Sequence, residues 1–287
     1  MTYLHRVKIK RQTGGKMGNV KYACAIWPWG TKTREQFIEA LRDAREAGYS
    51  YVESTKPTIG LFQDDFPAFR NICGEYGIRA VSFYFHMRGT RENDIDDLRN
   101  KLDFMKKAGV ECISIQALGT GDSKASPEQL RYTLDTVVEM SELCSLYGIQ
   151  PCLHPHCNTS VMYEDEIDFI MNNTDPDLLF FGPDTAHLLG GGCDPADIFR
   201  RYADRIRFTH MKDLKGTKAK TEENVGGIDV YSNFTELGNG DVDFESVFDV
   251  LKDIGYDGYL TSELDQTTLT NKESARINLE FMKKYFG

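Results

Sequence analysis

Apolar residues follow two different spacings along this chain, and the two spacings alternate. Three segments carry apolar residues every three to four positions, which predicts helices with one buried face. These segments span residues 34–47, 96–108 and 127–147. Three short apolar runs instead predict buried strands. They lie at residues 20–27, 177–184 and 205–210.

A repeated unit of helix, glycine and strand accounts for much of the remaining chain. In five places a helix-like segment ends at a glycine that precedes a short strand, namely at Gly48, Gly77, Gly109, Gly148 and Gly255. A glycine in this position adopts the left-handed conformation that turns the chain out of the helix. Together with the three apolar runs this makes eight strands, which predicts an α/β fold, a single-domain (β/α)8 TIM barrel over residues 20–287. Residues 1–19 form a separate N-terminal extension in this interpretation.

Composition and charge narrow the class of protein. The chain has 287 residues, of which 40% are hydrophobic, and no apolar run approaches the roughly 20 residues that cross a membrane. We expect a cytoplasmic protein, because the N-terminal residues do not resemble a secretory signal. The seven cysteines form no CxxC pair and do not predict a disulfide framework. A formal net charge of −10 disfavours nucleic acid as a partner and favours a small, neutral substrate.

Residues that can bind a metal, transfer a proton or contact a substrate gather where the predicted strands end. Barrels of this class build their active sites there. Five of the six histidines fall at these positions, and only His5 does not. The residues at the strand ends are Trp27, Trp29, Glu53, His86, Gln116, His154, His156, Asp184, His187, His210, Lys212 and Glu263. We predict that they surround one active site.

Four of these residues are suited to hold a metal ion. His154, Asp184, His210 and Glu263 come from the last four predicted strands, and catalytic metal sites use three or four protein ligands. One such residue alone is more often structural, but four on neighbouring strands favour a shared site. Mixed nitrogen and oxygen donors suit Mn²⁺, with Co²⁺, Zn²⁺ or Fe²⁺ as alternatives. His156 lies on the same side of the extended chain as His154.

Three short motifs carry a resemblance to a known family: HPH at 154–156, DTAH at 184–187 and HMKD at 210–213. Together they resemble the sugar phosphate isomerase/epimerase superfamily of xylose isomerase-like barrels, and the likeness extends over nearly the whole chain from Lys21. It implies a metal bound by Asp184, His210, Glu263 and the residue that ends strand five. It also implies that His187 contacts the substrate or transfers a proton, and that Lys212 contacts the substrate.

One departure from the superfamily bears on the reaction. Ketose epimerases of this kind carry Glu at the end of strand five, whereas this chain has His154, as do members that remove water from a keto-inositol. Epimerisation is served by two opposed carboxylates, but elimination needs one base and one acid that protonates the leaving hydroxyl. We therefore predict a metal-dependent dehydratase, a carbon–oxygen lyase that acts on a keto-inositol or related keto-sugar through an enediolate. A ketose isomerase or epimerase is the alternative.

Roles follow for the remaining residues. Glu263 is a metal ligand and the candidate base, and the candidate acids are His156, His187 and Lys212. Candidate substrate contacts are Glu53, His86, Gln116 and Trp27, with Trp29 as a further part of an apolar wall. The long Gly-, Lys- and Thr-rich segment 214–243 is a candidate lid. The expected partner is a small keto-polyol rather than a membrane or nucleic acid, and a homo-oligomer is compatible with the sequence.

Two other classes fit less well. An endonuclease for abasic DNA uses a related barrel, but it needs a basic groove and more metal ligands than this chain offers. A barrel that only binds sugar has no need of four ligand-type residues.

Overall fold

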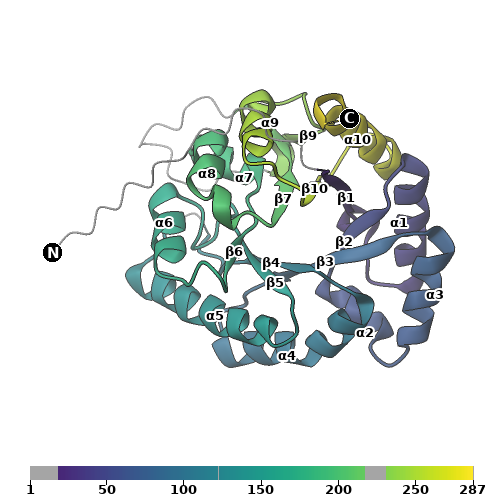
Figure 1. Ribbon diagram of the computed structural model, residues 1–287, viewed down its shortest axis with the longest axis horizontal. Helices are drawn as coiled ribbons and strands as arrows, with labels where there is room; N and C mark the ends of the chain where they lie inside the picture. Colours follow the sequence, from purple (N-terminus) through teal and green to yellow (C-terminus); the bar gives the residue numbers. More distant parts are fainter. Residues whose placement is uncertain (1–18, 122, 217–230, 287) are drawn as a thin grey trace.

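The structure of the protein is a computed structural model that describes residues 19–121, 123–216 and 231–286. Its strands form a central barrel and its helices surround them (Figure 1). The predicted extension, residues 1–19, lies outside the described residues except for Asn19, and so do residues 217–230 of the predicted lid. Among the described residues, no helix combines the length and the apolar character needed to cross a bilayer.

Eight parallel strands confirm the predicted barrel. In chain order they are β1 (Lys21–Ala25), β2 (Tyr51–Thr55), β3 (Arg79–His86), β4 (Cys112–Gln116), β5 (Gln150–His154), β6 (Phe180–Phe181), β7 (Phe208–Met211) and β10 (Tyr259–Ser262). Within the sheet they lie in the order β6-β5-β4-β3-β2-β1-β10-β7. The seam between β6 and β7 is closed by two isolated parallel bridges, Phe181 with Ile206 and Asp184 with His210.

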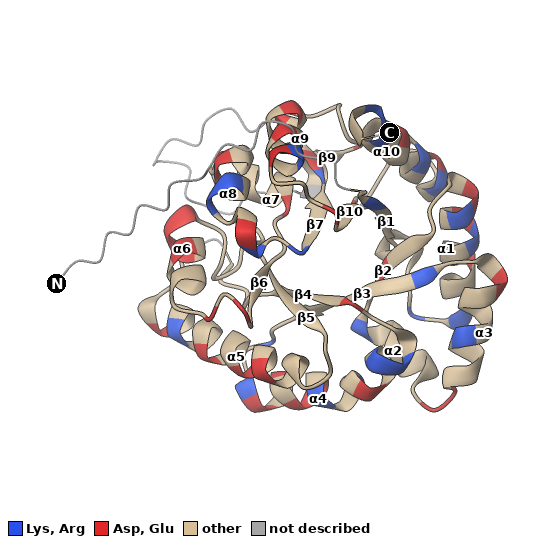
Figure 2. Ribbon diagram, in the orientation of Figure 1, with Lys and Arg blue, Asp and Glu red and all other residues tan. Residues whose placement is uncertain are grey.

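The helices cover the outer face of the strands. They are α1 (Arg34–Ala47), α2 (Lys56–Phe62), α3 (Phe66–Tyr76), α4 (Arg91–Ala108), α5 (Pro127–Ser145), α6 (Glu164–Asn172), α7 (Thr185–Gly190), α8 (Pro195–Arg201), α9 (Phe244–Asp253) and α10 (Asn271–Phe286). Short 3-10 helices span Trp27–Trp29, Ala203–Arg205 and Tyr231–Asn233. The five predicted junction glycines all have positive φ, from 61° to 107°. Acidic and basic residues are interspersed along the outer helices (Figure 2).

The barrel interior has an apolar layer with a polar layer above it. The apolar layer takes one residue from each of the eight strands, and these are Ala23, Tyr51, Val81, Cys112, Cys152, Phe180, Phe208 and Tyr259. Side chains on a strand return to the same face every second residue. The next inward positions after this layer include Glu53, Ser114, His154 and His210, so the sequence places polar groups directly above the apolar floor.

A buried carboxylate secures the chain beyond β7. Asp213 begins β8 (Asp213–Leu214), which pairs antiparallel with β9 (Phe234–Thr235). Its oxygens accept hydrogen bonds from the backbone amides of Gly238, Gly240 and Val242. A Cβ at Gly240 would lie 2.2 Å from Asp213 Oδ1, so this turn requires glycine. Asp213, the residue after Lys212, therefore anchors residues 238–242, which lie in the described part of segment 214–243.

Candidate active site and metal centre

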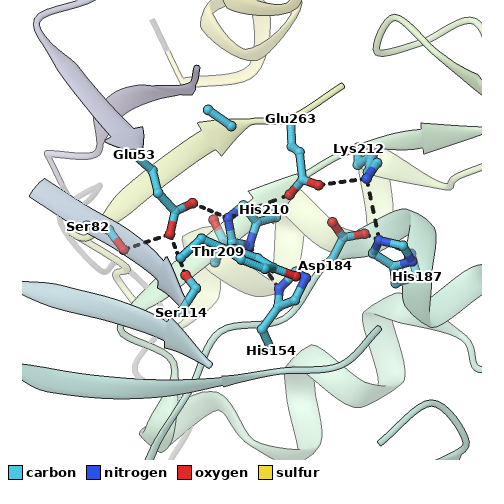
Figure 3. Close-up of polar contacts among 12 residues, drawn as sticks. Glu53, Ser82, Ser114, His154, Asp184, His187, Thr209, His210, Lys212 and Glu263 are labelled. Carbon is cyan, nitrogen blue, oxygen red and sulfur yellow. Dashed lines mark hydrogen bonds and ion pairs between the residues drawn. The ribbon is translucent and has the colours of Figure 1, made fainter. Parts of the chain in front are cut away.

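The four predicted metal ligands meet inside the mouth of the barrel. His154, Asp184, His210 and Glu263 each offer one ligand atom, and these atoms all lie within 4.8 Å of one another. All four residues are buried, with at most 3% of their surface exposed. Figure 3 shows their side chains gathered in one place. The Nδ1 atoms of His154 and His210 are 3.0 Å apart. Neighbouring donors at right angles around a transition metal, each at about 2.1 Å, have a separation of about 3 Å.

Unsatisfied polar atoms in this cluster fit a cation. His154 Nε2, Asp184 Oδ2 and Glu263 Oε2 are buried, and none has a hydrogen-bond partner among the described residues. Leaving a polar atom buried in this way is costly, and native structures seldom do so without a reason. The two carboxylate oxygens, on two of the four expected ligands, fit a divalent ion better than a purely structural network, whereas His154 faces His210 with its other nitrogen, Nδ1.

His210 is held between two carboxylates. Its Nε2 lies 2.5 Å from Glu53 Oε2 and 3.6 Å from Glu263 Oε2. Burial alone would lower the pKa of His210, but the charges of Glu53 and Glu263 outweigh it and raise this pKa to about 9. In the metal-free protein His210 is therefore a cation at neutral pH, and a metal has to replace one of its protons.

Burial favours the protonated form of the two acidic ligands, Asp184 and Glu263. Asp184 caps α7 by accepting the amide of His187 at 2.7 Å. Burial, followed by the charge of Glu263, raises the pKa of Asp184 to about 7. Burial also raises the pKa of Glu263. Burial is the main cause of both shifts, and a divalent cation beside these groups would favour their charged forms instead.

Lys212 is a buried cation at the edge of the metal cluster. Its Nζ donates to Glu263 Oε1 and to Asp265 Oδ2, each at 2.6 Å. It also lies 3.9 Å from the centre of the Phe234 ring. Burial would lower the pKa of Lys212, but the carboxylates of Glu263 and Asp265 raise it above its ordinary value. Lys212 is therefore a cation at neutral pH in the absence of substrate. It binds Oε1 of Glu263, whereas Oε2 of Glu263 has no hydrogen-bond partner among the described residues.

His156 and His187 form a second histidine group beside the cluster. His156 Nδ1 lies 2.7 Å from the carbonyl oxygen of Cys157, so this nitrogen carries the proton. The amide of Cys157 donates to His187 Nδ1 at 3.2 Å, and the ammonium of Lys212 lies 3.4 Å from His187 Nε2, so both ring nitrogens of His187 face donors. Burial is the main cause that lowers both pKa values, that of His156 to about 4. Both imidazoles are neutral at neutral pH.

The contacts of His187 decide between two potential metal sites. Ligand atoms of His154, His156 and His187 also lie within 4.8 Å of one another. However, one nitrogen of His187 accepts a backbone hydrogen bond, and the other lies 3.4 Å from the ammonium of Lys212, which would repel a cation. The group with Asp184 and Glu263 is therefore the better metal site.

The rim of the site contains three of the predicted substrate contacts. The half-buried Trp27 lies 6.2 Å from the His210 ring and donates to Asp265 Oδ1. Gln116 accepts a hydrogen bond from the Tyr84 hydroxyl at 2.9 Å. His86 is exposed at the end of β3, next to Gln116 across the β3–β4 ladder.

Two expectations change in the structure. The expectation of an apolar wall was wrong for Trp29, which packs in the core and donates to Asp43 on α1. The 3-10 turn explains this, because residues two apart do not share a face there. Glu53 is fully buried beneath His210 instead of reaching the rim. Both of its carboxylate oxygens have protein partners, which are Ser82 and Ser114 at Oε1 and His210 at Oε2.

Three residues of the site were not found from the sequence. Asp265 joins Trp27 to Lys212, Tyr84 packs edge-on against His154 at 5.2 Å, and Phe234 packs on Lys212. A signal existed for Asp265, because it lies two positions after Glu263. Phe234 lies in the predicted lid segment, 214–243, and carried no such signal.

Comparison with known proteins supports the fold and the family. The family model described as xylose isomerase-like TIM barrel matches residues 41–285. The chain belongs to this xylose isomerase-like family. Among curated relatives, inosose dehydratase of Geobacillus kaustophilus is 28% identical over 249 residues, which cover 79% of this chain and 80% of the relative. Inosose dehydratase of Lacticaseibacillus casei is 37% identical over 123 residues, which cover 42% of this chain and 41% of that relative.

Solved structures of the same architecture include enzymes of different activities. A probable 3-DHS dehydratase, AsbF of Bacillus anthracis, has a TM-score of 0.75 at 16% identity and covers 92% of this chain and 99% of its own. An L-ribulose 3-epimerase has a TM-score of 0.75 at 15% identity, with 93% and 94% covered. The IolI protein with a bound zinc atom has a TM-score of 0.73 at 17% identity, with 93% and 98% covered. At these identities the likeness shows the fold.

Proposed function

We propose that this member of the xylose isomerase-like family is a metal-dependent dehydratase that acts on a keto-inositol or a related unphosphorylated keto-sugar. The observation that carries the proposal is the buried cluster of His154, Asp184, His210 and Glu263, with its unsatisfied atoms beside the cation of Lys212. The curated relatives named inosose dehydratase support the same reaction class.

We assign the metal to these four residues and prefer Mn²⁺, because two imidazoles with two carboxylates suit it. When bound, the cation would polarise the substrate ketone and stabilise negative charge on its oxygen. Glu263 would bind the cation through Oε2, because Lys212 already binds Oε1. We therefore regard Glu263 as a ligand in preference to a base.

We assign the remaining groups as one base, one acid and one substrate contact. Elimination removes a proton from the carbon next to the ketone, and this electron pair forms the enediolate. The C–O bond one carbon further then breaks, and the hydroxyl leaves as water with a proton from an acid. We assign the base to His156, because its Nδ1 proton is fixed on the Cys157 carbonyl and the lone pair is on Nε2.

Lys212 is the candidate acid. Among His156, His187 and Lys212, which we considered from the sequence, only Lys212 is a cation at neutral pH. His187 is neutral and lies 3.4 Å from the Lys212 ammonium, so we regard it as a substrate contact in preference to the acid. Trp27 and Tyr84 supply an apolar side to the site, as a cyclitol ring requires.

Ketose epimerisation is the second candidate, and the common barrel of an L-ribulose 3-epimerase is the observation in its favour. The single base of our assignment works against it. Epimerisation exchanges a proton on two faces of one carbon, whereas the groups here are one base on one side and donors near Lys212.

An absorbance assay separates the two reactions. Purified protein with Mn²⁺ is mixed with a keto-inositol, and we expect a new ultraviolet band from the conjugated product. Treatment with a chelator should abolish the band, and added Mn²⁺ should restore it. A stereoisomer of the substrate without any ultraviolet product, detected by NMR, would establish epimerisation and contradict the proposal.

A further inference from the structure

Glu53 is a charged group in a place where barrels normally keep apolar residues. It lies on β2 with none of its surface exposed, two positions after Tyr51 of the apolar layer. An ionised carboxylate taken out of water costs several kcal/mol unless it is fully hydrogen-bonded. Glu53 therefore needs hydrogen-bond partners here, and its burial needs a functional explanation.

The partners come from three other strands. Ser82 on β3 and Ser114 on β4 donate to Glu53 Oε1 at 2.7 and 2.6 Å. His210 on β7 donates from Nε2 to Glu53 Oε2 at 2.5 Å (Figure 3). Both serines are fully buried, and they occupy positions that apolar residues would otherwise fill. The three contacts hold the carboxylate in one orientation from both oxygens.

This arrangement determines which atom of His210 faces the metal cluster. A carboxylate accepts hydrogen bonds, so the Nε2 of His210 carries a proton in this contact. Nδ1 is then the one ring nitrogen that can present a lone pair to a cation, and it faces His154 Nδ1 at 3.0 Å. In metalloproteins, a carboxylate on the far nitrogen of a histidine ligand fixes the ring and strengthens its binding.

We propose that Glu53 is a positioning residue of the metal centre, which holds His210 with Nδ1 toward the cation and does not touch the substrate. The inference rests on the proposed metal site. It assigns to Ser82 and Ser114 the role of holding the Glu53 carboxylate in place. It replaces the substrate contact that the sequence predicted. Glu53 acts on the reaction through His210 alone.

The test measures metal affinity without substrate. Mn²⁺ is titrated into apo wild-type protein, Glu53→Gln and Ser114→Ala in a calorimeter, and kcat and KM are measured separately at saturating Mn²⁺. We expect Glu53→Gln to weaken Mn²⁺ binding about 10- to 100-fold, the range for losing such a partner. Ser114→Ala keeps the contact to His210 and should weaken binding less. The KM of both variants should stay near that of the wild type.

Glu166→Gln is the matched control. Glu166 is also fully buried and accepts three hydrogen bonds, from the amides of Ala125, Met162 and Tyr163, but it has no contact to the cluster in the described structure. This variant should lower the melting temperature while its affinity for Mn²⁺ stays unchanged. It separates loss of a buried carboxylate in general from loss of this one.

Three results overturn the inference. An unchanged Mn²⁺ affinity in Glu53→Gln with a raised KM would make Glu53 a substrate contact. An unchanged Mn²⁺ affinity in Glu53→Gln with only a lower melting temperature would make Glu53 a structural residue. If Glu53→Gln does not fold, a Mn²⁺ affinity of Ser114→Ala equal to that of the wild type would overturn the inference as well. Wild-type protein that binds no Mn²⁺ would remove the metal centre itself, which is a separate failure.

Discussion

His156 and His187 pack with their ring centres 3.7 Å apart, and the backbone of a single residue, Cys157, contacts Nδ1 of both rings. The carbonyl of Cys157 accepts from His156 Nδ1, whereas its amide donates to His187 Nδ1. His156 therefore has its lone pair on Nε2, while Nε2 of His187 lies 3.4 Å from the ammonium of Lys212. The two imidazoles thus have different roles although they lie side by side.

We predict that alanine at His154 and alanine at His156 will fail in different ways. His154→Ala removes a ligand and should lower Mn²⁺ occupancy, with part of the rate restored by excess metal. His156→Ala should keep its metal and lose turnover about 10²- to 10⁴-fold, the range for removing a general base. Metal content by atomic emission and kcat at saturating Mn²⁺ give the comparison. Full metal and normal turnover in both variants would contradict the site.

The same pair of variants should differ in thermal stability. A ligand that binds only the folded state raises the melting temperature by mass action. Added Mn²⁺ should therefore raise the melting temperature of His156→Ala more than that of His154→Ala, as measured by calorimetric scanning. Equal shifts would place His154 outside the metal centre.

Replacing Lys212 by methionine should separate metal binding from catalysis. Lys212 holds Glu263 Oε1, so its removal frees a carboxylate oxygen and removes a positive charge next to the cation. We expect Lys212→Met to bind Mn²⁺ at least as tightly as the wild type, while kcat falls about 10²-fold or more through loss of the acid. Calorimetric titration and steady-state kinetics test both parts. Weaker Mn²⁺ binding in this variant would argue against Glu263 as a ligand.

Metal binding should release protons, and their number should depend on pH. The pKa of His210 is raised to about 9 and that of Asp184 to about 7, and both residues must lose a proton to bind a cation. Affinity should therefore rise with pH up to about 9. Near pH 8 about one proton should be released per ion, and near pH 6 about two. Calorimetry in buffers of different ionisation enthalpy measures this number, and a constant value of zero would contradict the assignment.

Gly240→Ala should destabilise the protein through Asp213. The added Cβ would lie 2.2 Å from Asp213 Oδ1 and would force the turn away from the carboxylate. Overpacking of this kind costs about 1–3 kcal/mol, which denaturant unfolding can detect. Gly121→Ala is a control, because its Cβ would meet nothing within 4 Å although its φ of 63° carries its own strain. Equal stability of Gly240→Ala and the wild type would show that the turn can move.

The regular part of the fold was predictable because it depends on local signals. The helix predicted at 34–47 is α1 residue for residue, and a glycine with positive φ follows at Gly48. The strand predicted at 177–184 shortened to Phe180–Phe181, because Gly182 and Pro183 follow and proline has no amide for a ladder. Irregular backbone of this kind has no periodic pattern in the sequence.

The position of the site was predictable from strand ends, but the depth of each residue was not. His154, Asp184, His210 and Glu263 follow their strands closely and converge as expected. Glu53 lies lower, next to a shift in register between β2 and β3 that the sequence does not reveal. Contacts from distant loops, such as Phe234 on Lys212, depend on tertiary packing and leave no trace in spacing.

The weakly paired seam between β6 and β7 would give a bound metal ion a mechanical role. Asp184 and His210 are bridge partners across that seam, where isolated bridges take the place of a continuous ladder among the described residues. An ion bound by both side chains would hold the two strands together at this junction. We therefore expect metal binding to slow amide exchange along the seam, so that exchange rates there report on metal occupancy.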